Sequence, residues 1–265
     1  MHAMYRNIIF NNLMCNLGQP KIGVRYGGDY ILNYMDITSP INTINFSSHL
    51  DYGKTYNLIY KNIKENKFNF NLGGDHSVSV STIQPLLDIY NKDILIIWID
   101  AHADVNTFHT SKSKNTHGMP LAPLLGLMPH WYKSEKYKFR NRLVSSNLYY
   151  YGVRSIDKEE KYNIQNYNLK IFQNKDYLIN NIINHPAKRI HISCDVDAID
   201  PNLIYSTGTR VDKGLNVNDV LSVIDVCKKR LVSFDLVEFN PRIGNLKHRA
   251  ISLSTISSII NSVIY

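Results

Sequence analysis

The chain has 265 residues, 44% of them hydrophobic, which is enough for a buried core and predicts one domain over residues 1–265. Its formal net charge of +8 raises nucleic acid as a partner, but the basic residues are spread along the sequence without a zinc-finger, RNP or helix-turn-helix pattern, so we expect no nucleic-acid binding. The apolar runs are too short to span a membrane, and no signal-like segment follows Met1. The three cysteines are too few and too scattered for a disulfide framework. We therefore expect a cytoplasmic protein.

Five apolar runs have the composition of β-strands. In chain order, the predicted strands are Phe68–Leu72, Ile94–Ile99, Leu148–Tyr151, Arg189–Cys194 and Leu231–Val237. The run Ile94–Ile99 is apolar at every position, as expected of a strand that is covered on both faces. This pattern favours a parallel sheet.

Apolar residues also recur at intervals of three and four, which predicts helices around these strands. In chain order, the predicted helices contain Tyr56 to Ile63, Val80 to Tyr90, Tyr177–Ile183, Asn218–Lys229 and Leu253–Ile264. The alternation of strand and helix predicts a single-domain α/β fold of three layers, α/β/α, with a mainly parallel, doubly wound sheet. Functional polar residues are then expected at the carboxyl ends of the strands.

Three segments rich in carboxylates and imidazoles follow three of these strands: Gly73–Ser77, Asp100–Asp104 and Asp195–Pro201. In extended backbone, residues two apart point the same way, so the last two segments can each present several ligands to one side. Burying these groups together is unfavourable without cations, and six ligands rich in carboxylate suit two Mn²⁺-like ions better than one zinc ion. Caps after strands are the alternative for single residues, and we interpret Asp75 and Asp200 in this way.

These motifs resemble, in their order, those of the ureohydrolase superfamily, which includes arginases, agmatinases and formimidoylglutamases. The resemblance runs from about Gly18 to about Pro241. It implies two Mn²⁺ per chain and a first ion held by His76, Asp100, Asp104 and Asp195. The second ion would be held by Asp100, His102, Asp195 and Asp197.

The segment from Asp104 to Gly118 resembles the substrate loop of arginases in spacing and in residue type. By that resemblance, the α-carboxylate of L-arginine is bound by Asn106, Ser113 and Asn115. Asp157 would contact the α-amino group, and Thr209 is a further expected substrate contact. A surface turn is the alternative interpretation of the two asparagines.

The resemblance also implies three catalytic residues. Glu238 follows the last predicted strand, where the family places a glutamate that accepts the guanidinium, and a helix cap is the alternative. His117 matches the active-site histidine and is expected to protonate the leaving amine. Asp104 would orient a hydroxide that bridges the two ions. The expected reaction is the hydrolysis of L-arginine to L-ornithine and urea.

Two other functions stay open: an agmatinase or other guanidino-acid hydrolase, and an inactive ureohydrolase-like binding protein. All six expected ligands are present, but Ser155 stands where arginases commonly have Asp, and Gly28 stands where Pro is usual. Arg210 also replaces a usual Pro, and this second cation by the pocket is expected to raise the cost of binding arginine unless Asp212 or Asp157 pairs with it. The sequence leaves open whether the protein is a homo-oligomer.

Overall fold

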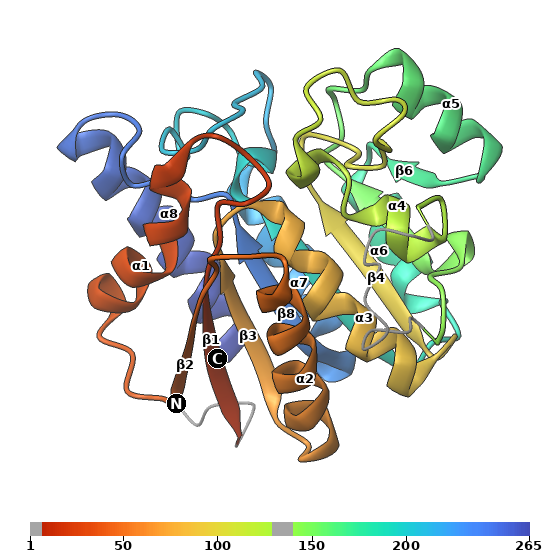
Figure 1. Ribbon diagram of the computed structural model, residues 1–265, viewed down its shortest axis with the longest axis horizontal. Coiled ribbons are helices and arrows are strands. Elements are labelled where there is room, and N and C mark those ends of the chain that lie inside the picture. Colours follow the sequence, from red (N-terminus) through yellow and green to blue (C-terminus); the bar gives the residue numbers. More distant parts are fainter. Residues whose placement is uncertain (1–6, 129–139) are drawn as a thin grey trace.

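The computed structural model describes residues 7–128 and 140–265. A sheet of eight strands crosses the molecule, and helices cover both of its faces (Figure 1). The strand order is β2-β1-β3-β8-β7-β4-β5-β6, and all neighbouring strands are parallel. In chain order, the strands β1 to β8 are Ile8–Met14, Ile41–Asn45, Phe68–Gly73, Ile94–Ile99, Leu148–Tyr151, Lys170–Phe172, Arg189–Asp195 and Leu231–Val237. The predicted three-layer fold with a parallel sheet is confirmed.

Two helical layers bury the two faces of the sheet. The helices α1 to α8 are Gly27–Met35, Leu50–Lys64, Ser79–Tyr90, Leu121–Leu125, Lys158–Asn166, Lys175–Ile183, Val217–Cys227 and Leu246–Ile264. Helices α1, α6, α7 and α8 pack on one face, and α2, α3 and α4 pack on the other. Along β4, Leu95, Ile97 and Ile99 belong to the first core, whereas Ile94, Ile96 and Trp98 belong to the second. The continuous apolar run in β4 is therefore explained by burial on both sides.

Three strands were not predicted from the sequence, because they lack an apolar run. Strand β1 contains Asn11 and Asn12, both buried, and the Asn11 amide donates to the side chains of Asn69 and Asn71 in β3. Strand β2 is an edge strand with only exposed and half-buried residues, and β6 has three residues. In β1, hydrogen bonds between side-chain amides thus take the place of the apolar contacts from which a buried strand is usually predicted.

Helices α1, α4 and α5 were also not predicted. Helix α1 begins at Gly27 and Gly28, a pair that usually marks a loop. A side-chain carbon at Gly28 would collide with the Asn12 amide oxygen, which explains why no proline stands there. Helix α5 is mostly polar and follows the N-cap residue Asp157, whose capping box offsets the weak apolar pattern of the helix.

All three cysteines of the chain are buried. Cys15, Cys194 and Cys227 are free thiols in the interior. Over residues 7–128 and 140–265, no helix has both the length and the apolar character needed to cross a membrane.

Candidate metal and substrate site

The predicted site residues gather where four central strands end. In the order β3-β8-β7-β4, these strands lie side by side, and their carboxyl ends meet at one edge of the sheet (Figure 1). His76 follows β3, Glu238 follows β8, Asp195 ends β7 and Asp100 follows β4. Crevices at the carboxyl ends of parallel strands are where doubly wound sheets bind ligands. The strand order therefore brings together segments that are far apart in the sequence.

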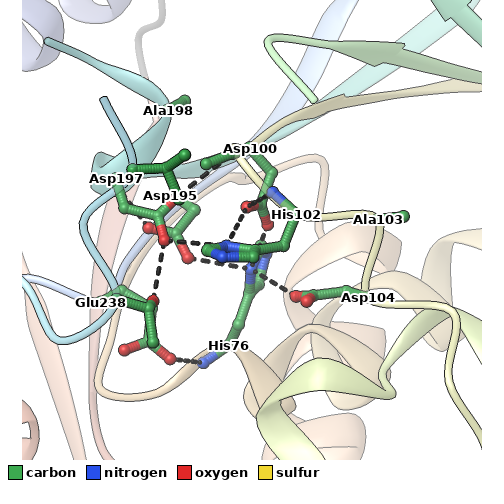
Figure 2. Close-up of polar contacts among 12 residues, drawn as sticks. His76, Asp100, His102, Ala103, Asp104, Asp195, Asp197, Ala198 and Glu238 are labelled. Carbon is green, nitrogen blue, oxygen red and sulfur yellow. Dashed lines mark hydrogen bonds and ion pairs between the residues drawn. The ribbon is translucent and has the colours of Figure 1, made fainter. Parts of the chain in front are cut away.

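His76 is the centre of a first group of ligand-type side chains (Figure 2). Its Nδ1 atom lies 3.0 Å from Asp100 Oδ2, 3.2 Å from Asp104 Oδ2 and 3.5 Å from Asp195 Oδ2. The imidazole stacks on Trp98, with ring centroids 4.0 Å apart, and the Trp98 indole donates to Asp100 at 3.0 Å. Stacking fixes the ring so that Nδ1 faces three carboxylates.

A second group contains Asp100, His102 and Asp197. The His102 Nδ1 atom lies 3.1 Å from Asp197 Oδ2 and 3.5 Å from Asp100 Oδ1. Asp100 therefore contributes one oxygen to each group. The Asp197 carboxylate is also held by the hydroxyl of Thr209, which donates to Oδ2 at 2.9 Å. Two ligand groups thus share one carboxylate.

The donors in both groups fit divalent metal ions. Ligand atoms of His76, Asp100 and Asp104 all lie within 4.8 Å of one another, and so do those of Asp100, His102 and Asp197. The His76 Nδ1 atom is buried and has no hydrogen-bond partner. Burial raises the pKa of Asp195 and of Asp197, and neighbouring carboxylates raise both further. Cations placed between these groups would remove that repulsion, and mixed carboxylate and imidazole ligands suit ions such as Mn²⁺.

The backbone of this site differs from the extended form that the sequence suggested. Asp104 has a left-handed backbone with φ of 50°, and it reaches the first group through that turn. Asp197 lies in the short helical turn Val196–Ala198, and its amide donates to Asp195 Oδ1 at 2.7 Å. Extended backbone therefore does not aim Asp104 and Asp197, whereas His102 lies in a parallel β-bridge with Ser155 and shares a group with Asp100, two residues before it. Left-handed residues other than glycine cost free energy and cluster at functional sites.

Glu238 is held on three sides beside the first group. It accepts from the His76 backbone amide at 2.9 Å and from Gln19 Nε2 at 2.5 Å, and its Oε1 atom lies 3.2 Å from His117 Nδ1. Burial lowers the pKa of His117, but the Glu238 carboxylate outweighs this and raises it to about 9. Gln19 was not predicted, because an amide before Pro20 carries no signal of metal binding or catalysis.

A cavity of about 190 Å³ opens beside the two groups. Its lining includes seven of the predicted residues: His102, Asp104, Asn106, His117, Asp157, Asp195 and Thr209. Ser155 also lines it, whereas Ser113 is exposed and Asn115 is half-buried on the neighbouring loop outside the lining. The structure therefore brings Asn106, but not Ser113 or Asn115, to the pocket wall.

Glu160 is a pocket residue that the sequence did not reveal. Asn106 Nδ2 donates to Asp157 Oδ2 at 2.8 Å, and the Glu160 amide donates to Asp157 Oδ1 at 2.7 Å. Glu160 is only 5% exposed. Burial raises its pKa to about 8, and the charges of Asp104 and Asp157 contribute. The spacing Asp-x-x-Glu of a capping box was the signal that could have identified it.

Arg210 does not bring a charge into the pocket. Its guanidinium lies 3.7 Å from the centre of the Tyr205 ring, and the side chain is exposed and outside the pocket lining. The expectation of a cation in the pocket was therefore wrong, because the aromatic ring holds the guanidinium by a cation–π contact.

Comparison with known proteins places this architecture in a family. The Arginase family model matches residues 19–263. The arginase of Saccharomyces cerevisiae is 36% identical over 204 residues, which cover 70% of this chain but only 61% of that protein, so the chain spans about three-fifths of its length. The arginase of Entamoeba histolytica is 32% identical over 263 residues, covering 85% of this chain and 88% of that protein. The crystal structure of the Entamoeba histolytica enzyme in complex with L-ornithine has a TM-score of 0.84 and 26% identity over 98% of both chains. The chain therefore belongs to the arginase family.

Proposed function

We propose that the protein is a manganese-dependent arginase that hydrolyses L-arginine to L-ornithine and urea. The observation that carries this proposal is the sharing of Asp100 between two ligand groups beside an acidic pocket. A shared carboxylate is typical of binuclear hydrolytic sites. Family membership and the arginases named above support the same activity.

The metal ligands in this proposal are those that the sequence indicates. One Mn²⁺ would be held by His76, Asp100, Asp104 and Asp195, and the other by Asp100, His102, Asp195 and Asp197. Two divalent ions lower the pKa of water towards about 7, which supplies hydroxide at neutral pH. Asp104 lies at the pocket wall, where its carboxylate can orient the nucleophile by accepting a hydrogen bond.

The pocket suits a substrate that carries a guanidinium group at one end and an amino group with a carboxylate at the other. Glu238 is buried beside the first group, outside the pocket lining, and would accept the guanidinium, because its neighbours outweigh burial and hold the pKa of its carboxyl group below the usual value. Asp157 and Glu160 stand together in the lining and would contact the α-amino group. Asn106 lies next to Asp157, and we assign it, with Ser113 and Asn115 on the same loop, to the α-carboxylate. Thr209 donates to Asp197 and lines the pocket, where its side chain would also contact the substrate.

His117 is assigned the proton transfer that completes the reaction. In the metal-free protein, the Glu238 carboxylate outweighs burial and raises the pKa of His117 to about 9, which favours a protonated imidazole, and His117 lines the pocket. When the carbon–nitrogen bond breaks, the electron pair goes to the departing amine, which must gain a proton. His117 would donate that proton and regain one from solvent.

The remaining assignments follow from composition. We propose that residues 1–265 form one domain that acts in the cytoplasm, because three buried free thiols fit a reducing compartment. L-arginine is the proposed partner, without nucleic acid or membrane.

A substrate panel tests the activity. Urea release should be measured from L-arginine, agmatine and guanidinobutyrate, with Mn²⁺ and after its removal by a chelator. We expect arginine to be the best substrate and activity to depend on Mn²⁺. Faster turnover of agmatine would make the protein an agmatinase instead. Fewer than about one Mn²⁺ per chain, together with no urea from any substrate, would indicate a binding protein.

A further inference from the structure

A chain of hydroxyl groups leads from His76 away from the pocket and into the sheet. The His76 Nε2 atom lies 2.9 Å from Ser193 Oγ in β7, and Ser193 Oγ lies 3.2 Å from Ser79 Oγ in α3. The Ser79 hydroxyl donates to Asp235 Oδ2 in β8 at 3.0 Å. All four side chains are 0% exposed. A buried carboxylate is thus connected to a predicted metal ligand through two serines.

The surroundings of Asp235 keep it an acceptor. Asn71 donates to Oδ1 at 2.7 Å, the Thr82 hydroxyl donates to Oδ2 at 2.5 Å, and His191 Nε2 lies 3.4 Å from Oδ2. Burial raises the pKa of Asp235, but His191 and these donors outweigh it and hold the pKa below its usual value. An ionised carboxylate has no hydrogen to donate. The three side chains that hydrogen-bond to it, those of Asn71, Ser79 and Thr82, must therefore be the donors.

This requirement sets the direction of every hydrogen bond in the chain. Since Ser79 donates its only hydroxyl hydrogen to Asp235, the Ser79 oxygen must accept a hydrogen bond from the Ser193 hydroxyl. Ser193 has then used its own hydrogen, so its oxygen must accept from His76 Nε2. The hydrogen of a neutral His76 imidazole consequently sits on Nε2. The lone pair is left on Nδ1, the atom that faces three carboxylates.

We propose that Asp235 is a positioning residue that fixes the tautomer and the orientation of His76 for metal binding, acting through Ser79 and Ser193. A partner on the second nitrogen of a ligating histidine is known to tune metal affinity. The inference rests on the proposed function in one respect, that His76 binds a metal ion. A purely structural role for Asp235 is the competing explanation, since it also ties β8 to β3 and α3.

Two hydroxyls on the same helix give a matched test. Ser79→Ala removes the link between Asp235 and His76, whereas Thr82→Val removes a donor to the same carboxylate oxygen without interrupting that link. Mn²⁺ affinity and the number of ions per chain should be measured for both variants in chelator-buffered Mn²⁺, together with thermal stability. We expect Ser79→Ala to lower the affinity for one of the two Mn²⁺ ions by about 10- to 100-fold, and Thr82→Val to bind both ions with normal affinity.

A second variant cuts the chain at its other end. Ser193→Ala leaves the bonds of Asp235 to Thr82 and Asn71 intact and should weaken Mn²⁺ binding as much as Ser79→Ala does. The double variant should then be no weaker than either single one, because one connection has been cut twice. Ser193→Ala keeps the inference testable if Ser79→Ala does not fold.

The outcomes separate this inference from the proposed function. Equal losses of affinity in Ser79→Ala and Thr82→Val, or normal Mn²⁺ binding by Ser79→Ala and Ser193→Ala, would overturn the role of Asp235. A wild-type protein that binds two Mn²⁺ but releases no urea from arginine would overturn the proposed activity instead. The affinity comparison would still decide the role of Asp235, because it does not depend on turnover.

Discussion

Replacing Glu160 by glutamine should make the metal-free protein more stable at alkaline pH. Glu160 has a pKa of about 8 in the folded protein, against a usual value of 4.5. Between these values the folded protein holds a proton that the unfolded chain has released, so stability falls as pH rises. Glutamine does not titrate, and its amide oxygen can still accept from the Asp157 amide. The variant therefore does not lose this stability as the pH rises.

The size of the effect follows from the two pKa values. One pKa unit corresponds to about 1.4 kcal/mol, so the full penalty is about 5 kcal/mol above pH 8. Only about 1 kcal/mol of it is present at about pH 5.5, and nearly all of it at about pH 8.5. The stability gap between Glu160→Gln and wild type should thus widen by about 3 kcal/mol over this interval. For a chain of this size, the melting temperatures should separate by a further 6–12 °C, roughly.

Thermal unfolding followed by circular dichroism at both pH values would measure the gap, in protein stripped of metal with a chelator. Glu159→Gln is the matched control, because it removes a charge from the adjacent position of α5 outside the pocket lining. Adding Mn²⁺ should shrink the gap, since nearby cations favour ionised Glu160. A gap that changes by less than about 1 kcal/mol between the two pH values would show that Glu160 is not held protonated.

Three further predictions concern the site. Asp197→Ala should lose one of two Mn²⁺ and nearly all urea release, and metal analysis showing both ions still bound would contradict the ligand assignment. His117→Ala should keep both ions but lower kcat by about 10²- to 10⁴-fold, and a normal rate in the variant would remove its role. Wild-type kcat should fall at alkaline pH as His117 loses its proton, with a midpoint below the pKa of about 9 in the metal-free protein, because bound cations disfavour the protonated imidazole. The side chain in Asp157→Asn can still cap α5. The variant should raise KM for arginine by about 10- to 100-fold but leave KM for guanidinobutyrate unchanged, because that substrate has no α-amino group. Equal changes for both substrates would point to a displaced loop instead.

Much of the fold could be predicted because its central strands are apolar on both faces. The run Ile94–Ile99 matches β4 at both ends, and the predicted Leu231–Val237 matches β8. The strands that escaped prediction depend on partners far away in the chain, such as Asn11 with Asn69 and Asn71. A buried asparagine looks like a loop residue until the partner that satisfies its amide is known.

The metal-type residues were predictable for a different reason. Aspartate and histidine directly after strands are unusual enough to be noticed, and the sheet edge brings them together. The residues that support them, such as Gln19, Glu160 and Asp235, are of ordinary types at ordinary spacings. Their importance depends on which strands are neighbours, and the strand order cannot be read from one sequence. Contacts such as Gln19 with Glu238, 219 residues apart, became visible only in three dimensions.

The position of β8 has a consequence for how a cell makes this protein. β8 is the last strand to leave the ribosome, yet it separates β2-β1-β3 from β7-β4-β5-β6 in the sheet. His76 belongs to the first half, and the other five proposed ligands belong to the second. A nascent chain that has not yet reached Leu231 lacks the strand that joins them, so the proposed metal site cannot assemble before β8 has been synthesised.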